Sequence, residues 1–213
     1  MSDPAAVLTL ERNQALRERI LACALARVSA GGFAALTMQA LAEDVGIATG
    51  SLYRHFRSKG ELAVEVFAAA SQRELDALAA VLAGPGRPSA RLAAGLRQFA
   101  GRAWNSRRLA FALIAEPVDP QVDEQRLLYR EAYAELFVGL LEEGMATGEF
   151  RLTDAGLVAA CLVGAIAESL VGPLSPPARA AREAGRLTQD LGDVSQSLVT
   201  FCLRAVGAEE PQP

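Results

Sequence analysis

The stretch Thr37–Phe56, TMQALAEDVGIATGSLYRHF, contains two short segments with helical patterning on either side of a tight turn. Thr37 is suited to cap a first helix over residues 38–45, because its hydroxyl can accept a backbone hydrogen bond. Gly46 fits the turn, since glycine adopts a positive φ without steric cost. Ala42 is small enough for a second helix, over residues 49–56, to cross the first closely. This arrangement predicts a helix-turn-helix.

The two segments differ in the face that each leaves to solvent. Their apolar positions fall where both helices must face one core, at Leu41, Val45, Ile47, Leu52 and Phe56. The second helix is left with a polar outer face made of Thr49, Ser51, Tyr53, Arg54 and His55. A helix of this kind can enter the major groove of DNA. Two alternatives stay open: Tyr53 and Phe56 also suit a core, and the polar residues also suit an ordinary surface.

The flanking sequence extends this unit on both sides. Residues 1–10 are expected to form a loose tail, and a long amphipathic helix is expected over 12–30, ended by Gly31-Gly32. After the motif, the sequence Ser58-Lys59-Gly60-Glu61 is a capping box that opens another long helix, which reaches about residue 83. The unit therefore has three helices before this connecting helix.

Gly- and Pro-rich breaks divide the rest of the chain into further helices. Helices are expected over 89–105 and 107–115, from Pro120 to about 144 with Asp119 as N-cap, and up to 170 with Thr153 as N-cap. A last helix is expected within 178–206. The chain is rich in Ala and Leu, which favours an all-α fold. We expect a DNA-binding domain over 12–58 and a larger domain over 59–207.

Composition limits the class of protein. Hydrophobic residues make up 51% and charged residues 22%, which indicates a globular chain. The net charge is −4, but residues 1–60 hold seven basic and five acidic residues, a mildly basic end that suits a polyanion. The three cysteines are far apart and suit a reducing compartment. We expect a cytoplasmic protein without a signal peptide, and the apolar run 155–167 is too short to span a membrane.

The segment Gly46–Leu62, GIATGSLYRHFRSKGEL, resembles the signature of the tetracycline-repressor (TetR) family, and the similarity extends from about Arg12 to Phe67. The resemblance implies a homodimer that binds a palindromic operator in double-stranded DNA. It also implies roles for eight residues. Phosphate contacts would come from Thr37, Tyr53, His55 and Lys59, base or groove contacts from Thr49, Gly50 and Ser51, and either kind from Arg54. One position departs from the pattern: Ala48 stands where the family often has Ser, so Thr49 is an alternative N-cap.

The remaining two-thirds resembles the family only in the length and order of its helices. The resemblance implies an effector pocket among the middle helices, for which the candidate lining residues are Trp104, Phe111, Tyr129, Tyr133 and Phe137. Glu168 lies in an otherwise apolar helix and is a further candidate, because a buried carboxylate needs a partner, either an arginine or a polar effector. The helices around 153–170 and ending near 206 would form the dimer interface, or alternatively an intrachain core. Cys161 and Cys202 are expected to be small buried residues on these helices.

The function favoured by these features is a repressor that a small, mostly apolar molecule releases from its operator. One alternative is a DNA-binding regulator that responds to a protein partner or acts as an activator. An enzyme is disfavoured, because the chain has one histidine and lacks a P-loop, a GxSxG motif and a dinucleotide fingerprint. An architectural DNA binder is disfavoured by the acidic bulk of the chain. We expect no catalytic residues, metal site or cofactor.

Overall fold

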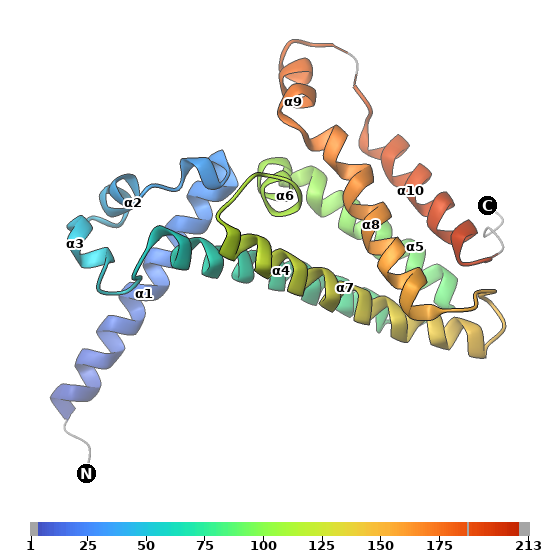
Figure 1. Ribbon diagram of the computed structural model, residues 1–213, viewed down its shortest axis with the longest axis horizontal. Coiled ribbons are helices and arrows are strands. Elements are labelled where there is room, and N and C mark those ends of the chain that lie inside the picture. The colour runs from blue at the N-terminus through green and yellow to red at the C-terminus, as the bar shows by residue number, and fades with distance from the viewer. Residues whose placement is uncertain (1–3, 187, 209–213) are drawn as a thin grey trace.

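The computed structural model describes residues 4–186 and 188–208. Within these ranges the chain forms ten α-helices and one short 3-10 helix, and no strand, which confirms the all-α fold. The helices are α1 Pro4–Gly31, η1 Phe33–Ala35, α2 Met38–Val45, α3 Thr49–Leu52, α4 Lys59–Leu82, α5 Pro88–Asn105, α6 Arg107–Ile114, α7 Pro120–Ala146, α8 Ala155–Leu174, α9 Pro176–Glu183 and α10 Leu191–Ala205. Figure 1 shows α1–α3 as a head at one end of the long helices α4 and α7.

The head has its own hydrophobic core. Ile20 and Val28 of α1 pack there with Leu41 of α2, Leu52 of α3 and Phe67 of α4. Two residues from beyond α4, Ala112 of α6 and Val122 of α7, are fully buried in the same core. The head is therefore packed directly onto α6 and onto the start of α7.

A second core fills the larger helical body. It joins the far half of α4 to α5, α7, α8 and α10, with Leu78, Leu96, Phe137, Leu162 and Leu198 among its buried members. Helix α4 contributes to both cores, so it connects the head to the body as one rigid element. The boundary between residues 58 and 59 stays a prediction, since the first half of α4 packs with the head.

Several expected helix boundaries differ from the structure, among them those of α1 and α8. The tail prediction was wrong from Pro4 onward, because α1 begins there, and proline is well tolerated in a first helical turn. Asp154, not Thr153, caps α8, and its carboxylate accepts a hydrogen bond from the Leu157 amide at 2.9 Å. Helix α8 also continues to Leu174, because Pro173 lies in its last turn and removes only one backbone donor.

The C-terminal region holds two helices where one was expected. Helix α9 ends before Gly185, which has a φ of +66° and so turns the chain out of the helix. Helix α10 begins after Asp190, whose carboxylate accepts the Asp193 amide at 2.8 Å. In Figure 1, α9 lies at the edge of the body and α10 returns alongside α8.

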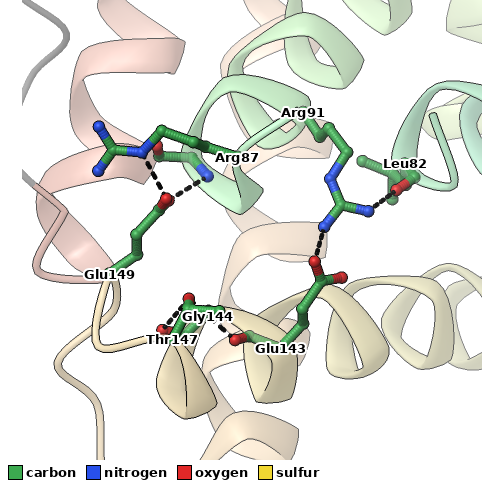
Figure 2. A network of polar contacts seen from close by, with 8 residues as sticks. Leu82, Arg87, Arg91, Glu143, Gly144, Thr147 and Glu149 are labelled. Carbon is green, nitrogen blue, oxygen red and sulfur yellow. Dashed lines mark hydrogen bonds and ion pairs between the residues drawn. The ribbon is translucent and has the colours of Figure 1, made fainter. Parts of the chain in front are cut away.

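A polar network fastens the end of the body that is remote from the head (Figure 2). Arg91 of α5 forms an ion pair with Glu143 of α7 and donates to the Leu82 carbonyl at 2.9 Å. The Glu149 carboxylate accepts from the Arg87 guanidinium at 2.5 Å and from the Ser89 amide at 2.9 Å. These contacts hold the start of α5 against the end of α7.

Candidate nucleic-acid interface and effector cavity

The helix-turn-helix has the local geometry that its sequence predicts. The Thr37 hydroxyl accepts the Ala40 amide at 3.2 Å and so caps α2. Helix α2 ends at Val45, the following Gly46 has a φ of +73°, and the Ile47 amide donates to the Ala42 carbonyl at 3.0 Å. Ala42 is buried, as the close crossing of two helices requires.

The second helix of the motif, α3, is shorter than the predicted segment 49–56. Helix α3 ends at Leu52, and the chain then turns so that the His55 and Phe56 amides both donate to the Leu52 carbonyl, at 2.9 and 3.0 Å. Ala48 occupies the N-cap position and has no side chain to accept a hydrogen bond, so the alternative N-cap at Thr49 was wrong. The missing cap and the glycine at position 50 both weaken a helix of this length.

The aromatic residues of the motif divide between core and surface. Phe56 is fully buried, and the Arg17 guanidinium lies 4.8 Å from the centre of its ring. Tyr53 is 50% exposed, so it is not a core aromatic. The side chains of Arg54 and Ser51 lie together, with a hydrogen bond of 2.9 Å between them.

All eight residues predicted to contact DNA lie at least partly on the surface. The exposed ones are Thr37, Gly50, Tyr53, Arg54 and Lys59, and the half-buried ones are Thr49, Ser51 and His55. They come from the start of α2, from α3 and the turn after it, and from the start of α4. Their contacts with DNA stay predictions.

Lys59 is the first residue of α4, where the helix dipole favours an anion. The Ser58 hydroxyl accepts the Glu61 amide at 3.0 Å, as the capping box predicts. The second hydrogen bond of a capping box differs here, because the Glu61 carboxylate accepts the Arg57 amide at 2.6 Å rather than the Ser58 amide. The exposed Lys59 is therefore held on a firmly capped helix end.

Arginines of α1 fix the orientation of the motif, and sequence reasoning missed them. Arg27 pairs with the Asp44 carboxylate and donates to the Ala40 carbonyl at 2.9 Å. Arg19 donates to the Val45 carbonyl at 3.0 Å. No spacing rule links these partners, which lie 13 to 26 residues apart in the chain.

A cavity of about 100 Å³ lies among α4, α5, α6, α7 and α8. Tyr129, Tyr133 and Phe137 lie on its wall, as expected. Trp104 and Phe111 lie outside it, because α5 and α6 present Ala103 and Ala110 to the cavity instead. Most of the wall is apolar.

Glu168 does not reach the cavity either. Helix α8 presents Val163, Ile166 and Ala167 to it, and Glu168 is exposed on another face of the same helix. The expectation of a buried carboxylate was therefore wrong for the protomer: within the described residues Glu168 forms no ion pair with Arg107 or Arg108.

One side of the cavity is polar. Arg102 binds the Glu74 carboxylate through two hydrogen bonds of 2.6 and 2.8 Å. The Tyr133 hydroxyl donates to the carbonyl of the buried Ser71 at 3.4 Å, and the Tyr129 hydroxyl donates to the Ala68 carbonyl at 3.0 Å. Burial raises the pKa of both tyrosines above the usual range, so both hydroxyls remain protonated donors. These groups can orient a polar end of a ligand.

Arg126 connects the cavity to the head. It lines the cavity and donates to the Leu113 carbonyl and to the Glu116 carbonyl, each at 2.9 Å. Burial lowers the pKa of Arg126, an effect that the carboxylate of Asp123 opposes. The Glu116 carboxylate in turn accepts the amides of Phe33 and Ala34, at 2.9 and 3.1 Å. Two residues thus link the cavity wall to the turn that precedes the helix-turn-helix.

The outer face of α8 and α10 is apolar and uncovered in the protomer. Leu157 is 63% and Phe201 is 58% exposed. The run 155–167, expected to be too short to span a membrane, is part of the longer helix α8, which alone among the helices of the described ranges is long and apolar enough to cross a membrane by length and composition. Of its apolar window, 28% is buried. Cys161 is exposed on α8, contrary to expectation, whereas Cys202 is buried and burial raises its pKa to about 12.

Comparisons with known proteins agree with this geometry. Residues 20–66 match the model of the bacterial regulatory proteins of the tetR family, and residues 85–170 match that of a tetracyclin repressor-like C-terminal domain. The chain is similar to the HTH-type transcriptional repressors KstR of Rhodococcus jostii, with 46% identity over 57 residues, and of Mycolicibacterium smegmatis, with 43% identity over 84 residues.

These matches cover 27% and 38% of this chain, and 27% and 40% of the two relatives. Over the whole fold, the chain resembles the crystal structure of the regulator FadR from Bacillus subtilis in complex with stearoyl-CoA. The TM-score is 0.71 at 17% identity, covering 89% of this chain and 98% of the other.

Proposed function

This chain belongs to the tetR family of bacterial regulatory proteins, and we propose on that basis that it is a homodimeric transcription repressor, which a small, mostly apolar molecule releases from a palindromic operator. The observation that carries the effector part is the apolar cavity enclosed by five helices, with a polar side and a direct link to the head. The repressor part is supported by the similarity of part of the chain to the two KstR repressors.

The head supplies the DNA contacts in this proposal. Ser51 of α3 and Arg54 of the turn that follows α3, which are joined by a hydrogen bond, read bases. Tyr53 and Lys59 bind phosphates on either side of them. A palindromic operator requires two heads about 34 Å apart, so that they reach successive major grooves.

The size of the cavity suggests how an effector acts. A volume of about 100 Å³ is smaller than the roughly 300–1,000 Å³ of a typical small-molecule site. A ligand of ordinary size therefore parts the surrounding helices, and it binds more tightly to the protein with parted helices. Such a difference in affinity is what a ligand needs to shift a conformational equilibrium.

Arg126 gives this movement a route to the head. A displaced Arg126 changes the position of the Leu113 and Glu116 carbonyls, and the Glu116 carboxylate holds the turn at Phe33 and Ala34. The packing of Ala112 in the head core adds a second contact between α6 and the head. In our proposal this shift changes the spacing of the two heads and weakens operator binding.

Helices α8 and α10 form the dimer interface in this proposal. Their exposed apolar residues, among them Leu157 and Phe201, need cover in water. Leu157, Cys161, Gly164 and Glu168 follow one another at about helical spacing on the exposed face of α8, and small residues in such a row let two helices approach closely. Glu168 then faces the partner subunit rather than the effector. A dimer of this kind accounts for the apolar character of α8 in a cytoplasmic protein.

The acyl chain of stearoyl-CoA in the FadR structure is a ligand of the apolar class that we propose. The alternative, a regulator that responds to a protein partner, fits a fully packed middle region better than one with a cavity. A family of regulatory proteins also gives no support to an enzyme.

The first test is selection of preferred DNA from a random pool by the purified protein, with its mass measured by light scattering. We expect a dimer that enriches a near-palindromic sequence. A monomer, or a dimer that enriches no sequence at low salt, contradicts the proposal.

The effector is tested separately by thermal-shift screening of apolar and amphipathic compounds. The control variant is Ala110→Phe, which fills the cavity from α6. Stabilisation of the wild type but not of this variant supports the cavity as the site. Apolar compounds that stabilise neither protein, or both equally, contradict it.

A further inference from the structure

A second and larger pocket, of about 610 Å³, lies between the end of α1, the start of α6 and helix α9. Four arginines line it: Arg107 and Arg108 from α6, and Arg179 and Arg182 from α9. It is separate from the apolar cavity, and the two share only Ser106, the residue before α6. The pocket is therefore basic where the cavity is apolar.

Trp104 holds two of these arginines in place. The Arg107 guanidinium lies 5.0 Å from the centre of the Trp104 ring, and that of Arg182 lies 5.4 Å from it. Stacking on an indole ring restricts a long side chain while leaving its N–H groups free to bind a ligand. Trp104 lies outside the apolar cavity and does not line the basic pocket itself, but it supports two arginines that do.

The hydrogen-bonding groups of Arg182 are only partly used. Its Nη2 donates to the Pro173 carbonyl at 2.7 Å, whereas its Nη1 is buried and has no partner within the described residues. A buried cationic N–H group without an acceptor is unfavourable, and native structures rarely leave one. Arg182 therefore adds a positive charge to the wall of the pocket that its own hydrogen bonds use only in part.

The charges of the pocket are not balanced by its own carboxylates. Arg179 lies 3.7 Å from Glu183, but Arg107 and Arg108 form no ion pair within the described part of the chain. The other carboxylate on the wall, Glu116, already accepts two backbone amides. Burial, and then the charge of Arg107, lowers the pKa of Arg182.

The start of α6 adds to the positive potential. No side chain caps this helix at Ser106, so its first amides lack an acceptor from a cap, and a helix N-terminus favours an anion. Together with the unbalanced arginines, this end of α6 makes the wall of the pocket complementary to negative charge.

We propose that this pocket binds a small molecule with two or more anionic groups, phosphates or carboxylates. The volume lies within the range of small-molecule sites, and planar guanidinium groups are suited to bidentate contacts with both kinds of anion. Ser29, Gly31 and Gly32 of the head lie on the same wall, so an occupant contacts the head and the body together.

The test measures binding of inorganic pyrophosphate, and in parallel of citrate, to the full chain by isothermal titration calorimetry without DNA. We expect the wild type to bind at least one of the two, and the comparison shows whether phosphate or carboxylate is preferred. Arg107→Gln removes an exposed charge and is expected to weaken binding on the order of tenfold, as the loss of one charge-assisted hydrogen bond does.

Two variants control for charge and for the DNA-binding surface. Arg73→Gln removes an exposed arginine of α4, and Lys59→Gln removes a cation at the predicted phosphate contact. Both are expected to bind the anion as the wild type does. Arg182→Gln is expected to weaken binding as well, and Arg107→Gln keeps the test valid if that variant does not fold.

The proposal is overturned if neither anion binds the wild type, or if Arg107→Gln binds as tightly as Arg73→Gln. Loss of binding in Lys59→Gln alone also overturns it, because the anion then occupies the DNA-binding surface. Ala110 lines the apolar cavity and not this pocket, so Ala110→Phe is expected to retain anion binding, with a smaller change in affinity than Arg107→Gln, whether or not the apolar effector exists.

Discussion

Glu116→Gln tests the connection between the helical body and the head. The Glu116 carboxylate accepts the Phe33 amide at 2.9 Å and the Ala34 amide at 3.1 Å, across 83 and 82 residues of sequence. Glutamine keeps the shape of the side chain but has no charge and has one acceptor oxygen instead of two. The change therefore removes one of these hydrogen bonds and weakens the other.

The expected cost follows from the kind of hydrogen bond lost. A bond to a charged acceptor contributes about 1.5–3 kcal/mol and one to a neutral acceptor about 0.5–1.5 kcal/mol. The Ala34 bond is exposed and contributes least. We therefore expect Glu116→Gln to cost about 1–3 kcal/mol, which lowers the Tm by about 2–4 °C for each kcal/mol in a chain of this length.

The DNA affinity is expected to fall with the stability, because a loosely held head is less well ordered before it binds. The loss of DNA affinity cannot exceed the free energy that the substitution costs, and about 1–3 kcal/mol corresponds to a loss of about 5- to 150-fold. Differential scanning calorimetry and fluorescence anisotropy with a selected operator measure the two effects. Glu124→Gln, an exposed change of equal charge on α7, is the control. If Glu116→Gln matches this control in both assays, Glu116 does not couple the domains.

The remaining predictions concern DNA binding and dimerisation. Tyr53→Phe and Lys59→Ala are each expected to weaken binding to specific and random DNA alike. Lys59→Ala is also expected to reduce the slope of log affinity against log salt concentration by about 1. Unchanged DNA affinity at moderate salt refutes the phosphate contacts. Arg54→Ala is expected to change the sequence selected from a random pool, and an unchanged motif contradicts base recognition. Gly164→Arg is expected to yield monomers by light scattering, since a Cβ at this position meets no atom within 4 Å in the protomer. Gly139→Arg, at an equally open position on α7, is expected to remain a dimer. If both variants are dimers, this face of α8 is not the interface.

Local sequence patterns were sufficient to predict the helices and the helix-turn-helix. Thr37, Gly46 and Ser58 act within a few residues of their own position, so their capping and turn roles can be read without knowing the fold. One of the errors fell on Thr153 and Asp154, two adjacent residues of which either can cap a helix. Neighbouring caps of similar strength are decided by the packing of the whole helix.

Only half of the residues expected to line the apolar cavity were predicted correctly from the sequence. Tyr129, Tyr133 and Phe137 follow helical spacing on α7, so finding one on the wall implies the others. Glu168 was expected inside because its neighbours are apolar, but apolar residues cover more than one face of α8. A helix that is apolar all round packs against the protein on one side and is available to a partner on another, and its sequence alone does not distinguish these faces.

Helix α6 gives the two proposed sites a common mechanical element. Leu109, Ala110 and Leu113 line the apolar cavity, whereas Arg107 and Phe111 line the basic pocket on another side of the same helix. Ala112, between them, is buried in the core of the head. Because α6 has only eight residues, a ligand that displaces one side of this helix displaces its other side as well. A ligand at either site therefore changes the energy of the same displacement, and linkage requires that each ligand alter the affinity for the other by the same factor.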